Sequence, residues 1–139
     1  MKYPTATPST LPLQARAIKR RVLERVADAE DTHLTVDAEE GHWQPFGEGV
    51  RIKVLREHAG VMSYLLWLAP GARLPAHRHP MDEECVVLEG TLKVGTRIEV
   101  APGGYHLAHQ GALHAPVSTL TGATIFLRGA VPEADNALG

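Results

Sequence analysis

The residues of this chain that are best suited to chemistry lie close together in the sequence. His77 and His79 are separated by one residue, and Glu83 follows four residues after the second histidine. Residues two apart in a β-strand point to the same side, so the two imidazoles are expected side by side. Residues 80–82 then turn the chain, and we expect Glu83 to open the returning strand opposite the histidine pair. Two imidazoles and a carboxylate that converge in this way suit Fe(II), Mn(II), Ni(II), Co(II) or Zn(II) better than Ca(II) or Cu(I).

The histidine content of the chain points in the same direction. The sequence has 139 residues and eight histidines. Five of these histidines lie within one stretch of the sequence: His77, His79, His106, His109 and His114. Histidine is the commonest metal ligand in proteins, so this clustering favours a metal site. The formal net charge is only −2, and so weak a field indicates no nucleic-acid partner.

A longer pattern frames the predicted ligands, in the segment GARLPAHRHPMDEECVVLEG. Five residues separate Gly71 from His77, and six separate Glu83 from Gly90. With the His-x-His pair and the three-residue gap before the glutamate, this spacing resembles the first sequence motif of the cupin family at every fixed position. The resemblance implies an all-β chain folded as a single jelly-roll barrel. It also implies one divalent transition metal ion per chain, which is zinc, iron, manganese or nickel.

A second segment resembles the other cupin motif. Gly103 is followed by five residues, then by the tripeptide His-Gln-Gly, two further residues and His114. The family usually has proline where His109 stands, and the asparagine later in the motif is absent here. This similarity supplies His114 as the third imidazole of the site. In an alternative register, residues 102–106 form the turn and His106 supplies the ligand.

Four further side chains are candidates for the surroundings of the metal. Cys85 lies two residues beyond Glu83, so its thiol is expected on the ligand face, as a buried apolar residue or as an oxidisable thiol. His106 or His109 can serve in the cavity as a proton shuttle or hydrogen-bond donor, and otherwise they are packing or surface histidines. Tyr64 is the fourth, because its ring can seal the site from a predicted buried strand.

The elements that position these residues are short β-strands. From Val50 onward apolar residues alternate with polar ones, as in Val50, Ile52 and Val54 around Arg51 and Lys53. Glycine and proline turns separate the strands, a pattern typical of an all-β sandwich or barrel. Besides the strand that begins at Val50, strands are predicted near 62–68, before His79, and near 85–88, 91–94, 97–100, 105–108, 114–117 and 123–127.

Four segments are predicted along the chain. They are a flexible tail (1–10), an N-terminal helix and arm (11–42), the barrel (43–130) and a C-terminal tail (131–139). In the helix, Ile18, Val22 and Val26 recur every four residues and form an apolar stripe. Trp43 and Phe46 are expected to anchor the polar stretch before the barrel, because an aromatic side chain in such a stretch usually packs onto the main body.

Residues 43–128 resemble, more narrowly, the cupin-like C-terminal domain of ChrR-type anti-sigma factors. The resemblance is carried by Trp43, by the runs GVRIKVL, LLWLAPGAR and VLEG, and by His114-Ala115-Pro116. It implies a metal-bound sensory or small-ligand-binding module. The N-terminal zinc domain of those factors has a His-x3-Cys-x2-Cys motif that does not occur in this sequence, so binding of a sigma factor is not implied.

An enzymatic function is the alternative. A set of three histidines and one glutamate also resembles cupin dioxygenases and related oxidoreductases, in which Fe(II) binds O2 and a chelating substrate. By that resemblance the protein is an Fe(II)-dependent dioxygenase or oxidoreductase that acts on a small chelating substrate. A cavity open to the metal favours the enzyme, and a site sealed by Tyr64, Trp67, Cys85 or Phe126 favours the sensory module.

Partners and compartment follow from the remaining features. Val86, Leu88 and Trp67 fall on strand faces opposite the ligands, and an apolar outer face needs a cover from the N-terminal arm or a second subunit. We therefore expect a homodimer that binds a small-molecule ligand. Cys85 is the only cysteine, so no internal disulfide can form, which fits a reducing compartment. No apolar run is long enough for a signal peptide or a membrane span, so we expect a cytoplasmic protein without a membrane partner.

Overall fold

The computed structural model describes residues 32–132 of the chain. Contacts divide the chain into two units, Met1–Asp37 and Ala38–Gly139, and the described strands all belong to the second unit. The predicted flexible tail, the predicted N-terminal helix and residues 133–139 lie outside the described residues. Within the described part, all regular secondary structure is β-strand, which confirms the predicted all-β class.

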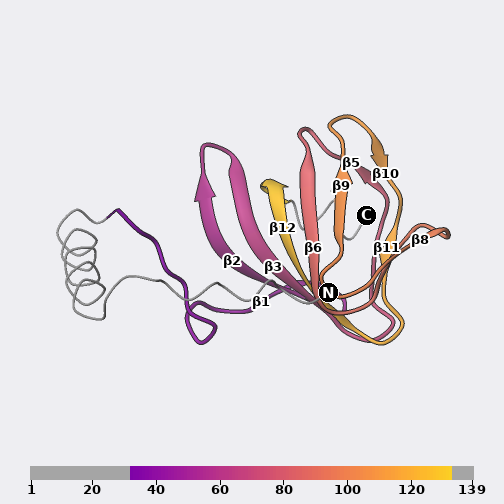
Figure 1. Cartoon of the computed structure of the whole chain (residues 1–139), viewed down its shortest axis with the longest axis horizontal. Coiled ribbons are helices and arrows are strands. Elements are labelled where there is room, and N and C mark those ends of the chain that lie inside the picture. Colours follow the sequence, from indigo (N-terminus) through magenta and orange to yellow (C-terminus); the bar gives the residue numbers. More distant parts are fainter. Residues whose placement is uncertain (1–31, 133–139) are drawn as a thin grey trace, which may run out of the picture. The chain divides into compact units, whose positions relative to one another are not determined.

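Twelve strands follow one another in the described part of the chain (Figure 1). They are β1 (Gln44–Gly47), β2 (Val50–His58), β3 (Val61–Leu68), β4 (Arg73–Leu74), β5 (His77–Arg78), β6 (Glu83–Gly90), β7 (Leu92–Val94), β8 (Ile98–Val100), β9 (Tyr105–Ala108), β10 (Leu113–His114), β11 (Val117–Ser118) and β12 (Ala123–Ala130). The strands predicted near 91–94 and 97–100 are β7 and β8, whose residues pair antiparallel.

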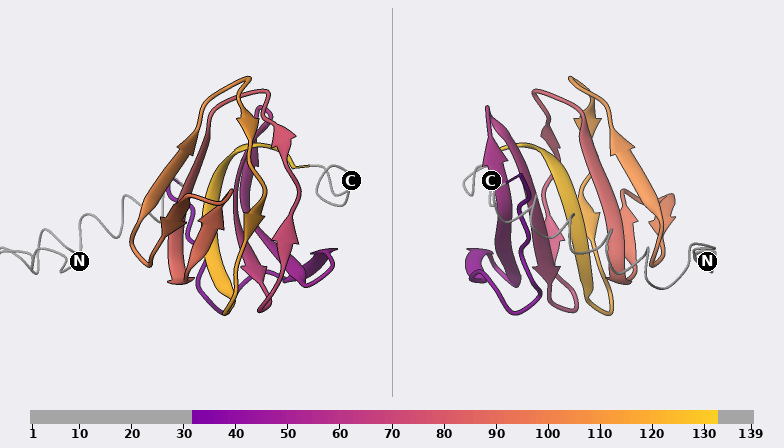
Figure 2. Two further views of the ribbon diagram at one scale, coloured as in Figure 1. Left: turned by 90° about the vertical axis from the view of Figure 1, so that its right-hand side faces the viewer. Right: turned by 60° about the vertical axis from the view of Figure 1, so that its left-hand side comes forward.

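The strands form three antiparallel sheets. The largest has the order β1-β2-β3-β12-β6-β9, so the last strand of the chain lies between β3 and β6. The second has the order β4-β11-β7-β8, and β10 pairs with β5 in a third sheet of two strands. Figure 2 shows the strands curving around a common interior. Buried side chains from both larger sheets fill this interior as one core, for example Leu66 and Ile125 from the first and Leu92 and Val117 from the second.

Strand β3 shows how the sequence builds this core. Met62, Tyr64, Leu66 and Leu68 are buried, whereas Trp67, between the last two, is exposed. Because residues two apart share a face, one side of β3 faces the interior along its whole length. Full burial of an aliphatic side chain contributes about 1.5–3 kcal/mol, and a slip of one residue would expose the whole set. The alternating pattern therefore fixes the register of the strand.

Two predicted strand features differ in the structure. The alternation that begins at Val50 fails at Lys53, which is buried, and at Val54, which is 46% exposed, and a β-bulge between Val54 and Arg56 then shifts the register of β2 against β3. The single strand predicted at 114–117 is two short strands, β10 and β11, which belong to different sheets. Pro116 lies between them, and a residue without a backbone N–H cannot continue the hydrogen-bond ladder.

The segment before β2 contains a strand that the sequence pattern does not predict. Residues 44–47 form β1 and pair with β2, although they lack an apolar alternation. Phe46 packs against the core as expected, whereas Trp43 is exposed. Lys53 of β2 is only 3% exposed, and its Nζ donates a hydrogen bond to the carbonyl of Ala38 at 3.0 Å. A buried ammonium group thus ties the segment before β1 to the large sheet.

The outer face of the large sheet carries the predicted apolar residues. Trp67 and Leu88 are exposed and Val86 is half-buried. The Arg51 guanidinium lies 5.6 Å from the centre of the Trp67 ring, within the range of a cation–π contact. The homodimer expected from this face stays a prediction.

Candidate metal centre

The predicted ligands lie where two chain segments meet. Strand β5 carries His77 and pairs antiparallel with β10, in which His114 is the backbone partner of His77. His79 follows directly after β5, and Glu83 is the first residue of β6. The strand, turn and returning strand predicted from the spacing are therefore present.

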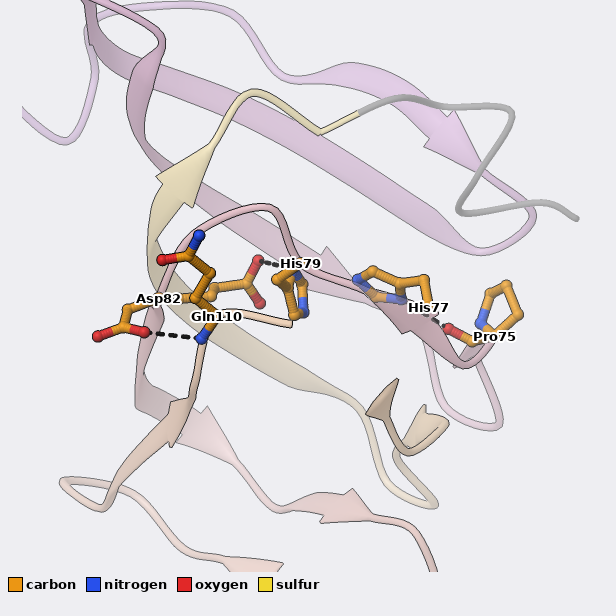
Figure 3. Close-up of polar contacts among 6 residues, drawn as sticks. Pro75, His77, His79, Asp82 and Gln110 are labelled. Atoms are coloured by element: carbon orange, nitrogen blue, oxygen red, sulfur yellow. Dashed lines mark hydrogen bonds and ion pairs between the residues drawn. The ribbon is translucent and has the colours of Figure 1, made fainter. Parts of the chain in front are cut away.

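The side chains of the first motif converge on one point. The imidazole rings of His77 and His79 lie 4.3 Å apart between centroids, edge to face at 75° (Figure 3). The carboxylate of Glu83 reaches the same place, with its Oε2 3.3 Å from Nδ1 of His79. One ligand atom from each of the three residues lies within 4.8 Å of the other two.

The orientation of His77 is set by the turn before β5. Its Nδ1 lies 2.9 Å from the carbonyl oxygen of Pro75, as Figure 3 shows. A carbonyl oxygen can only accept, so Nδ1 carries the hydrogen in this bond. The tautomer is thereby fixed, and Nε2 is the nitrogen of His77 that can bind a metal.

The donor set fits a divalent transition metal. Imidazole nitrogen and carboxylate oxygen bind such ions at about 2.0–2.2 Å, and small side-chain rotations bring atoms within 4.8 Å of one another to these distances. Two nitrogen donors exclude a site designed for Ca(II), which takes oxygen ligands throughout. Among the described residues, His106 is not a member of this convergent group.

Burial changes the protonation of Glu83. Glu83 is 9% exposed and its neighbour His79 is 7% exposed. Burial disfavours the charged carboxylate and raises the pKa of Glu83 from 4.5 to about 7. A bound cation has the opposite effect, because it interacts only with the ionised form. Metal binding to this site is therefore coupled to the release of a proton from Glu83 around neutral pH.

This pKa predicts how the stability of the metal-free protein depends on pH. Between the unfolded pKa of 4.5 and the folded pKa of about 7, the unfolded chain ionises Glu83 while the folded chain keeps it protonated. The folded state binds more protons, so its stability falls as the pH rises through this window, by up to about 3 kcal/mol. Urea unfolding of the metal-free wild type and of Glu83→Gln across that window measures the effect.

The Glu83→Gln variant removes this group from the titration, so the difference between the two unfolding curves isolates its contribution. Wild type should lose stability relative to the variant as the pH rises. Parallel pH profiles would contradict the assignment. Saturation of the wild type with Zn(II) should reverse the slope, because the ion favours the carboxylate.

A set of contacts, which we call the clasp, joins the loop of the first motif to that of the second. Asp82 Oδ1 accepts a hydrogen bond from the backbone N–H of Gln110 at 2.7 Å, as Figure 3 shows. The Arg78 guanidinium donates to the Gly111 carbonyl at 2.9 Å. The Gly111 N–H donates in turn to the carbonyl of His79, also at 2.9 Å. None of these contacts is predicted from the sequence, because their partners lie about thirty positions apart.

Two cavities border the three ligands. The larger one, the metal-side cavity, has a volume of about 140 Å³ and is lined by His77, His79 and Glu83 together with Tyr64, Arg78 and apolar side chains that include Phe46. The smaller one has about 30 Å³, lies against His77 and Glu83, and is lined also by Cys85 and His106. That volume is sufficient for about one water molecule.

The other candidate side chains are distributed differently. Cys85 is buried, and burial followed by the charge of Glu83 raises the pKa of its thiol to about 12, so it is a neutral thiol at physiological pH. His106 is half-buried at the smaller cavity, where it is the backbone partner of Cys85. His109 has a 77% exposed side chain, with Nδ1 4.0 Å from Asp82 Oδ1, and lies at the surface. Tyr64 lines the metal-side cavity.

Comparison with family models identifies one match. The family described as the ChrR cupin-like domain matches residues 31–131, which is most of the chain and includes the candidate metal ligands. No curated protein matches significantly. Within the part of the chain that the structure describes, no helix has the length and apolar character that crossing a bilayer requires.

Several solved structures are similar to this one. KdgF from Halomonas sp. is 20% identical with a TM-score of 0.64, covering 73% of this chain and 97% of that one. The structure of Rhodobacter sphaeroides SigE in complex with the anti-sigma ChrR gives 24% identity and a TM-score of 0.58, covering 89% and 70%. An acetylacetone dioxygenase from Acinetobacter johnsonii gives 14% and 0.61, covering 95% and 82%. At these identities the similarity shows a common fold.

Proposed function

Because the chain belongs to the ChrR cupin-like domain family, we propose that it is a module that binds one divalent transition metal and, through it, a small ligand. The observation that carries the proposal is the convergence of His77, His79 and Glu83 within 4.8 Å at the wall of a cavity of about 140 Å³. The proposed fourth ligand is His114, on the strength of its backbone pairing with His77.

The roles of the protein residues in this proposal are distinct. His77 and His79 supply neutral nitrogen donors, and the Pro75 carbonyl holds His77 in the required tautomer. Glu83 supplies the negative charge, and it gives up its proton when the ion enters. The ion, when bound, supplies a positive centre that can polarise or hold an oxygen ligand. The adjacent cavity provides the space where such a ligand binds.

A second candidate function is an Fe(II)-dependent dioxygenase or related oxidoreductase. The favouring observation is again the metal-side cavity, because the three ligands are not sealed off by Tyr64. Of the other residues that could close the site, Trp67 is exposed, as expected for the outer face of the sheet. One of the similar structures is an enzyme named as an acetylacetone dioxygenase, and a small chelating substrate would be consistent with that name. The similarity itself is one of fold.

The experiment that tests the proposal is elemental analysis of the purified protein, followed by O2-electrode traces. We expect about one transition-metal ion per chain in protein as purified or after anaerobic Fe(II) loading. Tightly held metal without O2 uptake, in the presence of small diketones, thiols or hydroxy acids, supports the ligand-binding module. Iron with substrate-dependent O2 uptake supports the dioxygenase instead. Failure to retain any metal would refute both.

A further inference from the structure

Two charged residues that the metal site does not use as ligands lie beside those ligands in the sequence. Arg78 stands between His77 and His79, and Asp82 directly precedes Glu83. Both residues are exposed, so neither contributes to the core. Each instead makes one hydrogen bond of the clasp, to a partner 33 positions along the chain for Arg78 and 28 positions for Asp82.

The strand pair that carries the proposed fourth ligand is very short. Strands β5 and β10 pair at two positions, Arg78 with Leu113 and His77 with His114. In the described part of the chain, neither strand pairs with a strand of the two larger sheets. An isolated pair of strands is at best marginally stable in water. The register that sets His114 opposite His77 therefore depends on contacts outside the pair.

The clasp supplies such contacts just beyond the end of this strand pair. The backbone N–H of Gly111 donates to the carbonyl of His79, and the Arg78 guanidinium donates to the carbonyl of the same glycine. Asp82 accepts from the N–H of the preceding residue, Gln110, as Figure 3 shows. The two charged side chains thus bind backbone groups of adjacent residues in the loop of the second motif.

We infer that Arg78 and Asp82 are positioning residues of the metal site, which hold the second-motif loop (109–112) in register with the ligands of the first motif. The inference rests on the proposed function, because metal binding is what the two residues would support. Neither side chain belongs to the convergent group of three ligands. Groups that orient ligands typically contribute about 10- to 100-fold to metal affinity, so the loss of either side chain should weaken metal binding by about 10-fold.

A direct effect of charge predicts a different pattern. The metal ion is positive, so an effect of charge alone would strengthen metal binding when Arg78 is neutralised and weaken it when Asp82 is neutralised. Action through the clasp predicts weaker binding when the Arg78 guanidinium is removed. It also predicts that position 82 requires a hydrogen-bond acceptor and not a charge. The two explanations therefore differ in sign at Arg78 and in the effect of an amide at position 82.

The test measures the Zn(II) affinity of the full chain by competition with a chromophoric chelator. Asp82→Ala should bind Zn(II) about 10-fold more weakly than wild type. Asp82→Asn should bind within about twofold of wild type, because its amide oxygen can accept the same hydrogen bond from the Gln110 N–H. Arg78→Met keeps an apolar stem but loses the donor to Gly111, and it should also bind about 10-fold more weakly.

Two residues of the large sheet provide matched controls. Glu84 follows Glu83 as Asp82 precedes it, but its carboxylate accepts a hydrogen bond from the Tyr105 hydroxyl and lies 3.9 Å from the Arg128 guanidinium. Glu84→Ala and Arg128→Met remove the same charges from the chain and leave the clasp contacts in place. Each should change the Zn(II) affinity by less than about twofold.

A measurement on wild type tests the same inference without a variant that must fold. Coupling between two events is reciprocal, so a clasp that strengthens Zn(II) binding about 10-fold is stabilised about 10-fold by bound Zn(II). The amide hydrogens of Gln110 and Gly111 are donors in the clasp. Their exchange with solvent should slow by about that factor at Zn(II) saturation, measured by NMR under conditions in which the core strand β3 does not exchange.

The outcomes separate this inference from the proposed function. Wild type that binds no Zn(II) refutes the proposed function. Wild type that binds Zn(II), together with equal affinities of Asp82→Ala and Glu84→Ala, overturns the inference alone. Tighter binding by Arg78→Met, or equal weakening in Asp82→Asn and Asp82→Ala, assigns the effect to charge and also overturns it. Unchanged exchange of both clasp amides at saturation would contradict it independently.

Discussion

Replacing His114 by alanine should lower the affinity of the protein for Zn(II) or Co(II) by at least about 100-fold, the same effect as that of His77→Ala. His114 is the backbone partner of His77 in the antiparallel β10–β5 pair. This backbone pairing is the reason why we propose His114 as a further ligand. Loss of a direct ligand should exceed the 10- to 100-fold loss typical of groups that only orient ligands. Competition with a chromophoric chelator measures both affinities.

The controls for this prediction are the two neighbouring histidines. His109→Ala should change metal affinity by less than about threefold, because its side chain is at the surface. His106→Ala decides between the two registers of the second motif, since His106 lies at the small cavity beside His77 and Glu83. A large loss in His106→Ala with little change in His114→Ala would assign the third imidazole to His106. Circular dichroism of each metal-free variant excludes a general loss of structure.

Replacing Gly90 by alanine should destabilise the fold by about 3–5 kcal/mol, a large part of the 5–15 kcal/mol typical of a domain. Gly90 has φ of +73°, where a β-carbon costs about 1–2 kcal/mol. A β-carbon at this position would lie 1.9 Å from the carbonyl oxygen of Gly122 and 2.9 Å from Cα of Ala123. Both clashing atoms belong to the backbone of the neighbouring segment at the start of β12. The clash can therefore be removed only if β6 and β12 move apart. Urea unfolding of metal-free protein gives the free-energy difference.

Gly71 at the other end of the same motif provides the matched control. Its φ of +83° is also in the left-handed region, but nothing lies within 4 Å of a β-carbon added there. Gly71→Ala should therefore cost only about 1–2 kcal/mol. Equal losses in the two variants would show that backbone conformation alone explains the requirement at Gly90. The comparison separates two reasons why a position can require glycine: a positive φ, and the lack of space for a β-carbon.

The sequence predicts the first half of the candidate site well, because that half depends on local geometry. Period-two alternation places His77 and His79 on one face, and a turn of three residues returns the chain at Glu83. The same rule accounts for the buried side of β3, including Tyr64. In each case the relevant information lies within a few residues of the position concerned.

Other features depend on residues far apart in the sequence, and no local pattern encodes them. The hydrogen bond from Gln110 to Asp82 spans 28 positions, and both residues are of types common in surface turns. Strand β1 forms because β2 offers it an edge, whereas its own side chains give no alternation. The break at Pro116 could be predicted from the missing N–H of proline, but the assignment of β10 and β11 to different sheets could not.

The clasp has a consequence for how a metal ion enters the site. Arg78 and the Gly111 N–H donate hydrogen bonds across the two ligand-bearing loops, and Asp82 accepts one from the Gln110 N–H, so protein groups join the loops directly. The conformational entropy of these loops is therefore lost when the chain folds, and little more is lost when a metal ion binds. Uptake should be fast and should leave the backbone nearly unchanged. Discrimination among divalent ions then rests on the chemical preferences of nitrogen and carboxylate donors, because a preassembled site responds to the ion by small rotations of its side chains.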